Sequence, residues 1–186
     1  MKTATSRGRN LRFGVKWTIS AMVLSLALPG TSAGESSFPS HCAKTETVVF
    51  SCKLLRSEKY ISLCGSQSLR APDAYLIYRF GTLDQKTKFA YPADVTGSLQ
   101  KFKSAHYFRA QVDRRDVSFS NSTGTYNIFS TFEGEEAPPY REGGVTMMMA
   151  GKRKGITLLC TTPYLDKLEL LDGVVGKGGG YLDDDD

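Results

Sequence analysis

The sequence is short of the features that mark several common protein classes. Helical periodicity is almost absent, so a helix-rich fold is not expected. No Cys-x-x-Cys pair is present, which argues against a zinc site built on such pairs. The chain has two histidines, and no Gly-x-Ser-x-Gly motif occurs after residue 34, so nothing there marks a serine nucleophile on a strained turn.

The first 33 residues contain no acidic residue at all. Their positive charges come from Lys2, Arg7, Arg9, Arg12 and Lys16. The apolar run Trp17–Leu28 follows, and the small residues Thr31–Ala33 stand after its end. This arrangement is typical of a secretory signal peptide, so residues 1–33 are predicted to be removed on export. The run has 12 residues, fewer than the roughly 20 that a helix needs to span a bilayer. The alternative to a cleaved signal peptide is a retained membrane anchor.

Removal of this segment would also remove the charge imbalance of the chain. The whole chain has 24 Lys and Arg and 19 Asp and Glu, and the first 33 residues hold five basic residues and no acidic one. The remainder therefore has 19 of each sign, and the pI near 9.0 belongs to the targeting segment. Nucleic-acid binding requires a basic face, so nucleic acid is not an expected partner. No stable membrane span is expected after processing.

Cysteine is scarce, but all four cysteines lie in the exported part, where an even count favours disulfides. The stretch Thr47–Ser66 predicts a hairpin of two apolar strands around a polar turn. If the two strands of this hairpin pair so that the numbers of facing residues sum to 116, Cys52 faces Cys64 at a separation that suits a disulfide. Cys42 would then pair with Cys160. The alternatives are buried free thiols and a zinc site.

Short β-rich runs separated by turn residues fill the rest of the chain. Further strands are expected at Ala74–Phe80, Lys88–Tyr91, His106–Val112, Tyr126–Phe132, Val145–Ala150 and Ile156–Cys160, with a short strand around Val117 and Phe119 and a loop over Gly134–Gly144. The predicted fold is all-β: a single antiparallel β-barrel or sandwich of about eight strands with a short C-terminal helix over Pro163–Leu171.

The predicted organisation has four parts. A signal peptide over residues 1–33 is followed by a flexible N-terminal arm over 34–44 and a disulfide-stapled β domain over 45–172. Residues 173–186 are predicted to be a disordered acidic tail, ending in Asp183–Asp186. That run could bind a hard cation, but consecutive acids on a tail do not preorganise coordination. No metal and no cofactor are expected.

Two groups of residues are candidates for catalysis. Ser104, His106 and Asp113 offer the residue types of a Ser-His-Asp triad, and the alternative is a solvated histidine at the end of a strand. Glu133, Glu135 and Glu136 offer paired carboxylates for glycoside chemistry, and the alternative is a solvated acidic loop.

Two loops are candidates for partner binding. Ser122, Thr123, Gly124 and Tyr126 place small hydroxyl residues around a glycine before an aromatic strand, a pattern that suits insertion into the cleft of another protein; the alternative is an ordinary turn. Lys152–Lys154, bracketed by glycines, is either a docking point for an acidic partner or a hairpin turn.

The cysteine frame and the sequences FSCKLL, YISLCGS, AYLIYRFG and KFAYP resemble a family of exported proteobacterial proteins. The resemblance covers about Cys42–Asp172 and includes the late LLC that ends at Cys160. It implies an exported, disulfide-bonded domain and brings no activity with it.

A second resemblance is to the membrane-bound and periplasmic inhibitors of c-type lysozyme, small eight-stranded barrels that place a Ser-Gly-x-x-Tyr loop in the lysozyme cleft. Ser122, Gly124 and Tyr126 match this pattern in part, with the spacing one residue different. Phe132–Gly134 stands where those inhibitors carry a lysine in a Thr-Lys-Gly stretch. The resemblance implies an inhibitory protein–protein contact.

Three functions follow from these observations. The first is an exported, non-enzymatic binding protein, plausibly an inhibitor or immunity-type partner of a cell-wall enzyme, in the bacterial periplasm or secreted. The second is a small-molecule carrier whose barrel cavity is lined by Tyr75, Ile77, Tyr126 and Ile128. The third is a hydrolase that uses the Glu133–Glu136 loop or His106.

Overall fold

The computed structural model describes residues 1, 3, 38–85 and 87–178. Apart from Met1 and Thr3, the predicted signal peptide lies outside the described residues, as does Asp183–Asp186. The elements below all belong to the unit Ser36–Asp186. Within the described ranges, no helix has the length and apolar character needed to cross a membrane.

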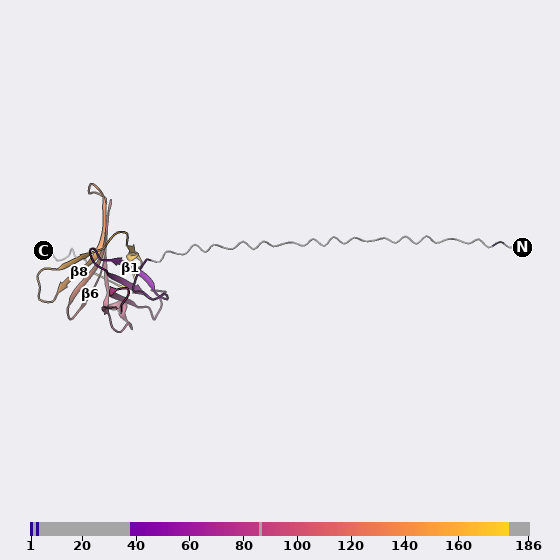
Figure 1. Ribbon diagram of the computed structural model, residues 1–186, viewed down its shortest axis with the longest axis horizontal. Helices are drawn as coiled ribbons and strands as arrows, with labels where there is room; N and C mark the ends of the chain where they lie inside the picture. The colour runs from indigo at the N-terminus through magenta and orange to yellow at the C-terminus, as the bar shows by residue number, and fades with distance from the viewer. Residues whose placement is uncertain (2, 4–37, 86, 179–186) are drawn as a thin grey trace. The chain divides into compact units, whose positions relative to one another are not determined.

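The described strands form two sheets, which Figure 1 shows in violet to magenta for the first three strands and in pink to orange for β6 to β8. The five-stranded sheet has the order β10 (Leu165–Asp166), β1 (Thr47–Lys53), β2 (Lys59–Gly65), β3 (Leu76–Thr82) and β4 (Phe89–Tyr91). The six-stranded sheet has the order β11 (Gly176–Lys177), β5 (Lys103–Arg109), β6 (Val112–Asn121), β7 (Gly124–Glu133), β8 (Tyr140–Met149) and β9 (Ile156–Leu159). Neighbours pair antiparallel, except that β11 runs parallel to β5.

The all-β prediction is confirmed, and the architecture is two packed sheets. In the part of the chain that the structure describes, the two hydrogen-bonded ladders do not close into a barrel. The chain enters the six-stranded sheet after β4 and returns to the five-stranded sheet after β9, where Leu54 forms an isolated bridge with Cys160. Cys160 also donates its backbone N–H to Gly143 of β8, so this residue belongs to both sheets.

Aromatic rings fill the space between the sheets. Phe119 of β6 stacks on Tyr126 of β7 at 4.8 Å between ring centroids, and it lies 4.5 Å from Tyr91 and 5.2 Å from Tyr78. Burial of the Tyr78 phenol raises its pKa. Such rings supply a large part of the burial energy of a small domain.

The four residues predicted to line a carrier cavity do not meet around one space. Tyr126 and Ile128 belong to the core between the sheets. Ile77 lies on the opposite face of β3 from Tyr78 because successive residues of a strand alternate. Tyr75 precedes β3, and its hydroxyl donates to Glu46.

All four cysteines form disulfides, as predicted, but the predicted pairing is wrong. The bonds are Cys42–Cys64 and Cys52–Cys160. In the hairpin, Cys52 faces Ile61, and opposed residue numbers sum to 113 instead of 116. An odd shift of register turns a side chain to the other face of a sheet, so Cys52 and Cys64 point away from each other.

The segment before β1 covers the outer face of the five-stranded sheet. From Phe38 onward, the stretch predicted to be a flexible arm is tied down by Cys42 and by hydrogen bonds. Ser51 donates to the Pro39 carbonyl, and the His41 backbone N–H donates to Ser62. The two serines are 1% and 0% exposed, so these bonds satisfy hydroxyls that water does not reach.

The predicted C-terminal helix over Pro163–Leu171 is absent among the described residues. Leu165 pairs with β1 instead, and Lys167 donates its backbone N–H to Val49. What remains is one turn of 3₁₀ helix, η2 (Leu168–Leu171), which buries Leu168 and Leu171 three residues apart. A second such turn, η1 (Ser98–Lys101), precedes β5. Tertiary pairing with β1 therefore overrides the local helical pattern.

Candidate functional site

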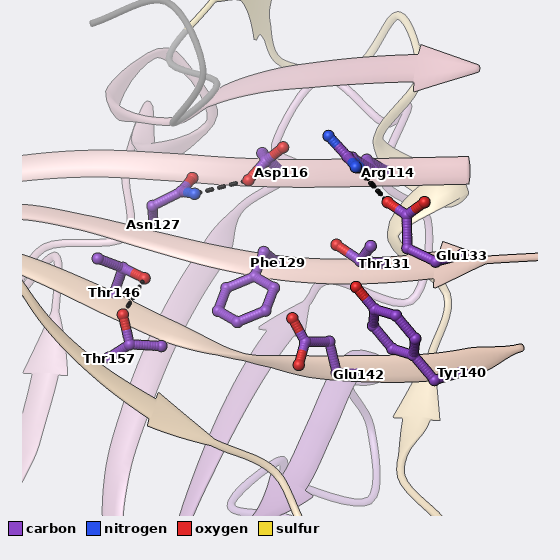
Figure 2. Close-up of a pocket in the computed structure, with 10 residues that line it drawn as sticks. All are labelled: Arg114, Asp116, Asn127, Phe129, Thr131, Glu133, Tyr140, Glu142, Thr146 and Thr157. Atoms are coloured by element: carbon purple, nitrogen blue, oxygen red, sulfur yellow. Dashed lines mark hydrogen bonds and ion pairs between the residues drawn. The ribbon is translucent and has the colours of Figure 1, made fainter. Parts of the chain in front are cut away.

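The six-stranded sheet has a groove on the face that points away from the core. Along β7, Tyr126 and Ile128 point inward, so Asn127, Phe129 and Thr131 point outward. The groove has a volume of about 270 Å³. Its lining, drawn in Figure 2, consists of Arg114, Asp116, Asn127, Phe129, Thr131, Glu133, Tyr140, Glu142, Thr146 and Thr157.

Gly144 of β8 leaves the middle of the groove empty. Strand register places it beside Phe129 of β7 and Leu159 of β9. An added Cβ would lie 2.3 Å from the Leu158 carbonyl oxygen, so only glycine lets β9 approach this closely. The position therefore has no side chain to cover the Phe129 ring.

One carboxylate of the groove is neutralised by an arginine of the same sheet. Glu133 is 5% exposed and accepts hydrogen bonds from Nε of Arg114, at 2.6 Å, and from a terminal nitrogen of the same guanidinium. The guanidinium also lies over the Tyr107 ring at 6.0 Å. Figure 2 shows this ion pair at one end of the groove. Arg114 thus pairs with a carboxylate of its own sheet.

A second carboxylate, Asp116, lies two residues after Arg114 on β6, and Figure 2 shows it between Arg114 and Asn127. It accepts a hydrogen bond of 2.6 Å from Nδ2 of Asn127. Burial raises the pKa of the Asp116 carboxyl, against smaller opposing effects of Asn127 and of the more distant Arg114. Oδ1 of Asn127 is buried and has no hydrogen-bond partner in the described structure.

The third carboxylate is Glu142 of β8, which is half-buried. No ion pair or hydrogen bond of its side chain occurs among the described residues, and Figure 2 shows it within the groove beside Phe129 and Tyr140. At the far end, Thr146 and Thr157 share a hydrogen bond of 3.0 Å between their hydroxyls. The groove therefore offers mainly hydrogen-bond acceptors.

The loop predicted to bind a partner is the tight turn between β6 and β7. Ser122 and Thr123 are exposed, while the Tyr126 ring is 9% exposed and stacked in the core. Oδ1 of Asn121 accepts hydrogen bonds from Thr123 and from the backbone N–H of Gly124, and Thr123 also bonds the Tyr126 hydroxyl at 2.9 Å. The turn is therefore rigid, and its role in binding stays a prediction.

The candidate catalytic histidine is placed beside its candidate acid. Nε2 of His106 lies 2.9 Å from Oδ1 of Asp113 across the β5–β6 pair. The described hydrogen bonds of the His106 ring reach Asp113 and not Ser104, although Ser104 lies on the same strand.

The predicted acidic loop is divided by the structure. Glu133 lies in the groove, whereas Glu135 forms an exposed ion pair with Arg109 and Glu136 is exposed. The three carboxylates therefore do not form one site.

The sequence interpretation missed Asp116, Asn127, Phe129 and Glu142. The signal was present in part, because the even-numbered core residues of β7 imply an outward-facing odd series that contains Asn127, Phe129 and Glu133. What the sequence could not supply was the alignment with β6 and β8. That alignment puts Asp116 opposite Phe129 and Glu142 opposite Thr131.

The basic turn Lys152–Lys154 joins β8 to β9. All three residues are exposed, and the backbone N–H of Lys152 donates to Met149. This geometry is that of a hairpin turn, and docking of an acidic partner at it stays a prediction.

The fold and the groove define a disulfide-bonded β-sandwich with a polar groove on one outer sheet face. No protein-family model, no curated protein and no solved structure matches the chain. The two resemblances read from the sequence therefore stay predictions. The basis for a function is the geometry of the groove and of the turn beside it.

Proposed function

We propose that this chain is an exported, non-enzymatic binding protein, an inhibitor or immunity-type partner of a cell-wall enzyme, that acts in the periplasm or after secretion. The observation that carries the proposal is the groove on the outer face of the six-stranded sheet. Polar side chains and a phenylalanine line it, and it opens away from the core. Such a combination of apolar surface and a few placed polar groups is typical of binding sites.

The two disulfides support export. Disulfides persist in oxidising compartments and are rare in the cytosol. Cys52–Cys160 joins β1 to the end of β9 and so ties one sheet to the other. A scaffold held in this way loses little conformational entropy on binding, which favours affinity.

The turn at Ser122 and Thr123 extends the same surface. It follows β6 and begins β7, and Ser120 and Thr125 lie between it and the row of Asn127. Four strand residues separate Thr123 from Asn127, which is roughly 13 Å, so a protein partner that fills the groove can also reach the turn. The turn predicted from the sequence and the groove found in the structure therefore contact the same protein partner in this proposal.

The fixed pairing of the polar groups favours binding over turnover. Glu133 is held by Arg114, and Asp116 is held by Asn127. His106 contacts Asp113 but shares no described hydrogen bond with a nucleophile. General base catalysis needs such a contact with the group that loses its proton.

The test is capture and inhibition of purified cell-wall hydrolases by the chain recovered from an oxidising compartment. The groove variant Glu142→Lys and the turn variant Thr123→Lys should weaken capture at least tenfold, about 1.4 kcal/mol. Asp73→Lys is the matched control, because this exposed acid lies outside the groove. Failure of the intact, fully oxidised chain to bind or inhibit any of these enzymes would refute the proposal.

A further inference from the structure

The groove has negative charge without matching positive charge. Of its four charged lining residues, Arg114 neutralises Glu133, and this leaves Asp116 and Glu142. Neither of these two acids forms an ion pair with a basic residue in the described part of the chain, where Asp116 accepts a single side-chain hydrogen bond, from the neutral amide of Asn127. Isolated carboxylates that are partly buried are costly unless something pairs with them.

An unsatisfied acceptor lies next to these acids. Asn127 is 6% exposed, and its Oδ1 has no partner among the described residues although its Nδ2 is bound to Asp116. Buried amide oxygens are nearly always hydrogen-bonded in folded proteins. The groove thus holds an unsatisfied acceptor beside Asp116.

The three acids of the groove do not gather closely enough to act together as ligands of one metal ion. Among the described residues, the group of three side chains whose ligand atoms lie within 4.8 Å of one another is Cys42, Glu46 and Cys64. Asp116, Glu133 and Glu142 do not form such a group. A larger cation with several donors matches this spacing better than a bare metal ion does.

The apolar part of the lining suits an organic cation. Phe129 and Tyr140 line the groove beside the acids. The face of an aromatic ring attracts guanidinium and ammonium groups, and it also covers the methylenes that carry them. The same sheet already holds Arg141 over the Phe132 ring at 5.0 Å, on its other face.

We infer that the groove receives an arginine or lysine side chain of the protein partner, with Asp116 and Glu142 accepting hydrogen bonds from its cationic group and Phe129 covering its stem. This inference rests on the proposed function, because it names the chemistry that the groove recognises. Guanidinium supplies five donors and ammonium three, which fits a site built of acceptors.

The inference can be tested without knowing the partner. Blocked tripeptides Gly-Arg-Gly, Gly-Lys-Gly and Gly-Gln-Gly are titrated into the labelled full chain, and the side-chain amide signal of Asn127 and the backbone signal of Phe129 are followed by NMR. The two basic peptides should shift both signals saturably, with dissociation constants below about 10 mM. The glutamine peptide should bind at least tenfold more weakly.

Matched variants assign the effect to the groove. Asp116→Asn with Glu142→Gln should weaken the basic peptides at least tenfold, whereas Glu58→Gln with Asp73→Asn removes the same charge at exposed positions and should change little. Equal shifts by the three peptides, basic peptides that do not bind, or full binding by the groove variant would overturn the inference. In each of those cases capture of a cell-wall enzyme would still stand as the separate test of the proposed function.

Discussion

Replacing Cys52 and Cys160 by alanine should destabilise the fold more than replacing Cys42 and Cys64. The two bonds close loops of 108 and 22 residues. In the chain-entropy model these loops correspond to about 4.8 and 3.4 kcal/mol, so the long-loop variant should lose about 1.4 kcal/mol more. Each pair includes one cysteine almost fully buried, Cys52 at 3% and Cys64 at 0% exposure, so the packing losses nearly cancel.

The assay is urea and thermal unfolding of both double variants, followed by far-ultraviolet circular dichroism. The extra loss corresponds to a difference of about 3–6 °C in Tm for a domain of this size. Hydrogen exchange gives a second readout. Loss of Cys42–Cys64 should expose the segment 38–46 and Ser62, whereas loss of Cys52–Cys160 should lower protection in both sheets. An equal or larger loss in the Cys42 and Cys64 variant would refute this reasoning.

Three further predictions concern the groove and the Glu46–Arg79 ion pair of the other sheet. Gly144→Ala should cost about 3 kcal/mol in urea unfolding because its Cβ meets the β9 backbone, whereas Gly151→Ala, at φ 73° with no neighbour within 4 Å, should cost about 1–2 kcal/mol. Burial raises the pKa of the Asp116 carboxyl, so the stability of the wild type falls as pH rises through that pKa. Asp116→Asn should therefore be more stable than the wild type at pH 7, and the gain should vanish below about pH 3, as measured by urea unfolding at both pH values. Burial raises the pKa of Glu46, but hydrogen bonds from Arg79 and a backbone N–H outweigh this effect and leave the pKa lowered. Glu46→Gln should therefore lower the free energy of unfolding by about 1–3 kcal/mol at pH 7, and by progressively less as pH falls through that lowered pKa, measured in the same way.

Strand positions were predictable where the pattern was local. The hairpin of β1 and β2 and the strand β3 follow directly from alternating apolar and β-branched residues, and the turn at Ser122 and Thr123 follows from its small residues. The register of the first hairpin was not predictable in this way. A β-bulge between Val48 and Phe50 and the position of the turn decide it, and the sulfur pairing depends on it.

The first half of β8 shows why the site itself could not be read from the sequence. Tyr140–Gly144 is rich in glycine and acid, which predicts a loop, yet it is a strand. A Cβ on Gly143 would lie 2.8 Å from the Tyr164 ring, and one on Gly144 would meet Leu158. Both glycines are required by segments that are distant in the sequence, so no local pattern reveals them. Of the two, Gly144 lies opposite Phe129, a residue that lines the groove.

The groove lowers the stability of the folded chain, and this loss of stability is the best physical reason to regard the groove as functional. A sheet face that only needs to meet water can use residues whose charges and amides are solvated, as most exposed strand positions do. Here Asp116 is buried enough to raise its pKa, Asn127 holds an acceptor that no described residue satisfies, and Gly144 has no side chain to pack. Each of these choices destabilises the free protein, and the proposed cation over Phe129 would offset the cost at Asp116. Strain and unsatisfied groups of this kind concentrate where proteins bind, since stability is then traded for recognition. If Asp116→Asn both stabilises the chain and abolishes the preference for basic peptides, that trade is demonstrated at a single residue; a variant that is less stable at pH 7 and still selects basic peptides would place the function elsewhere.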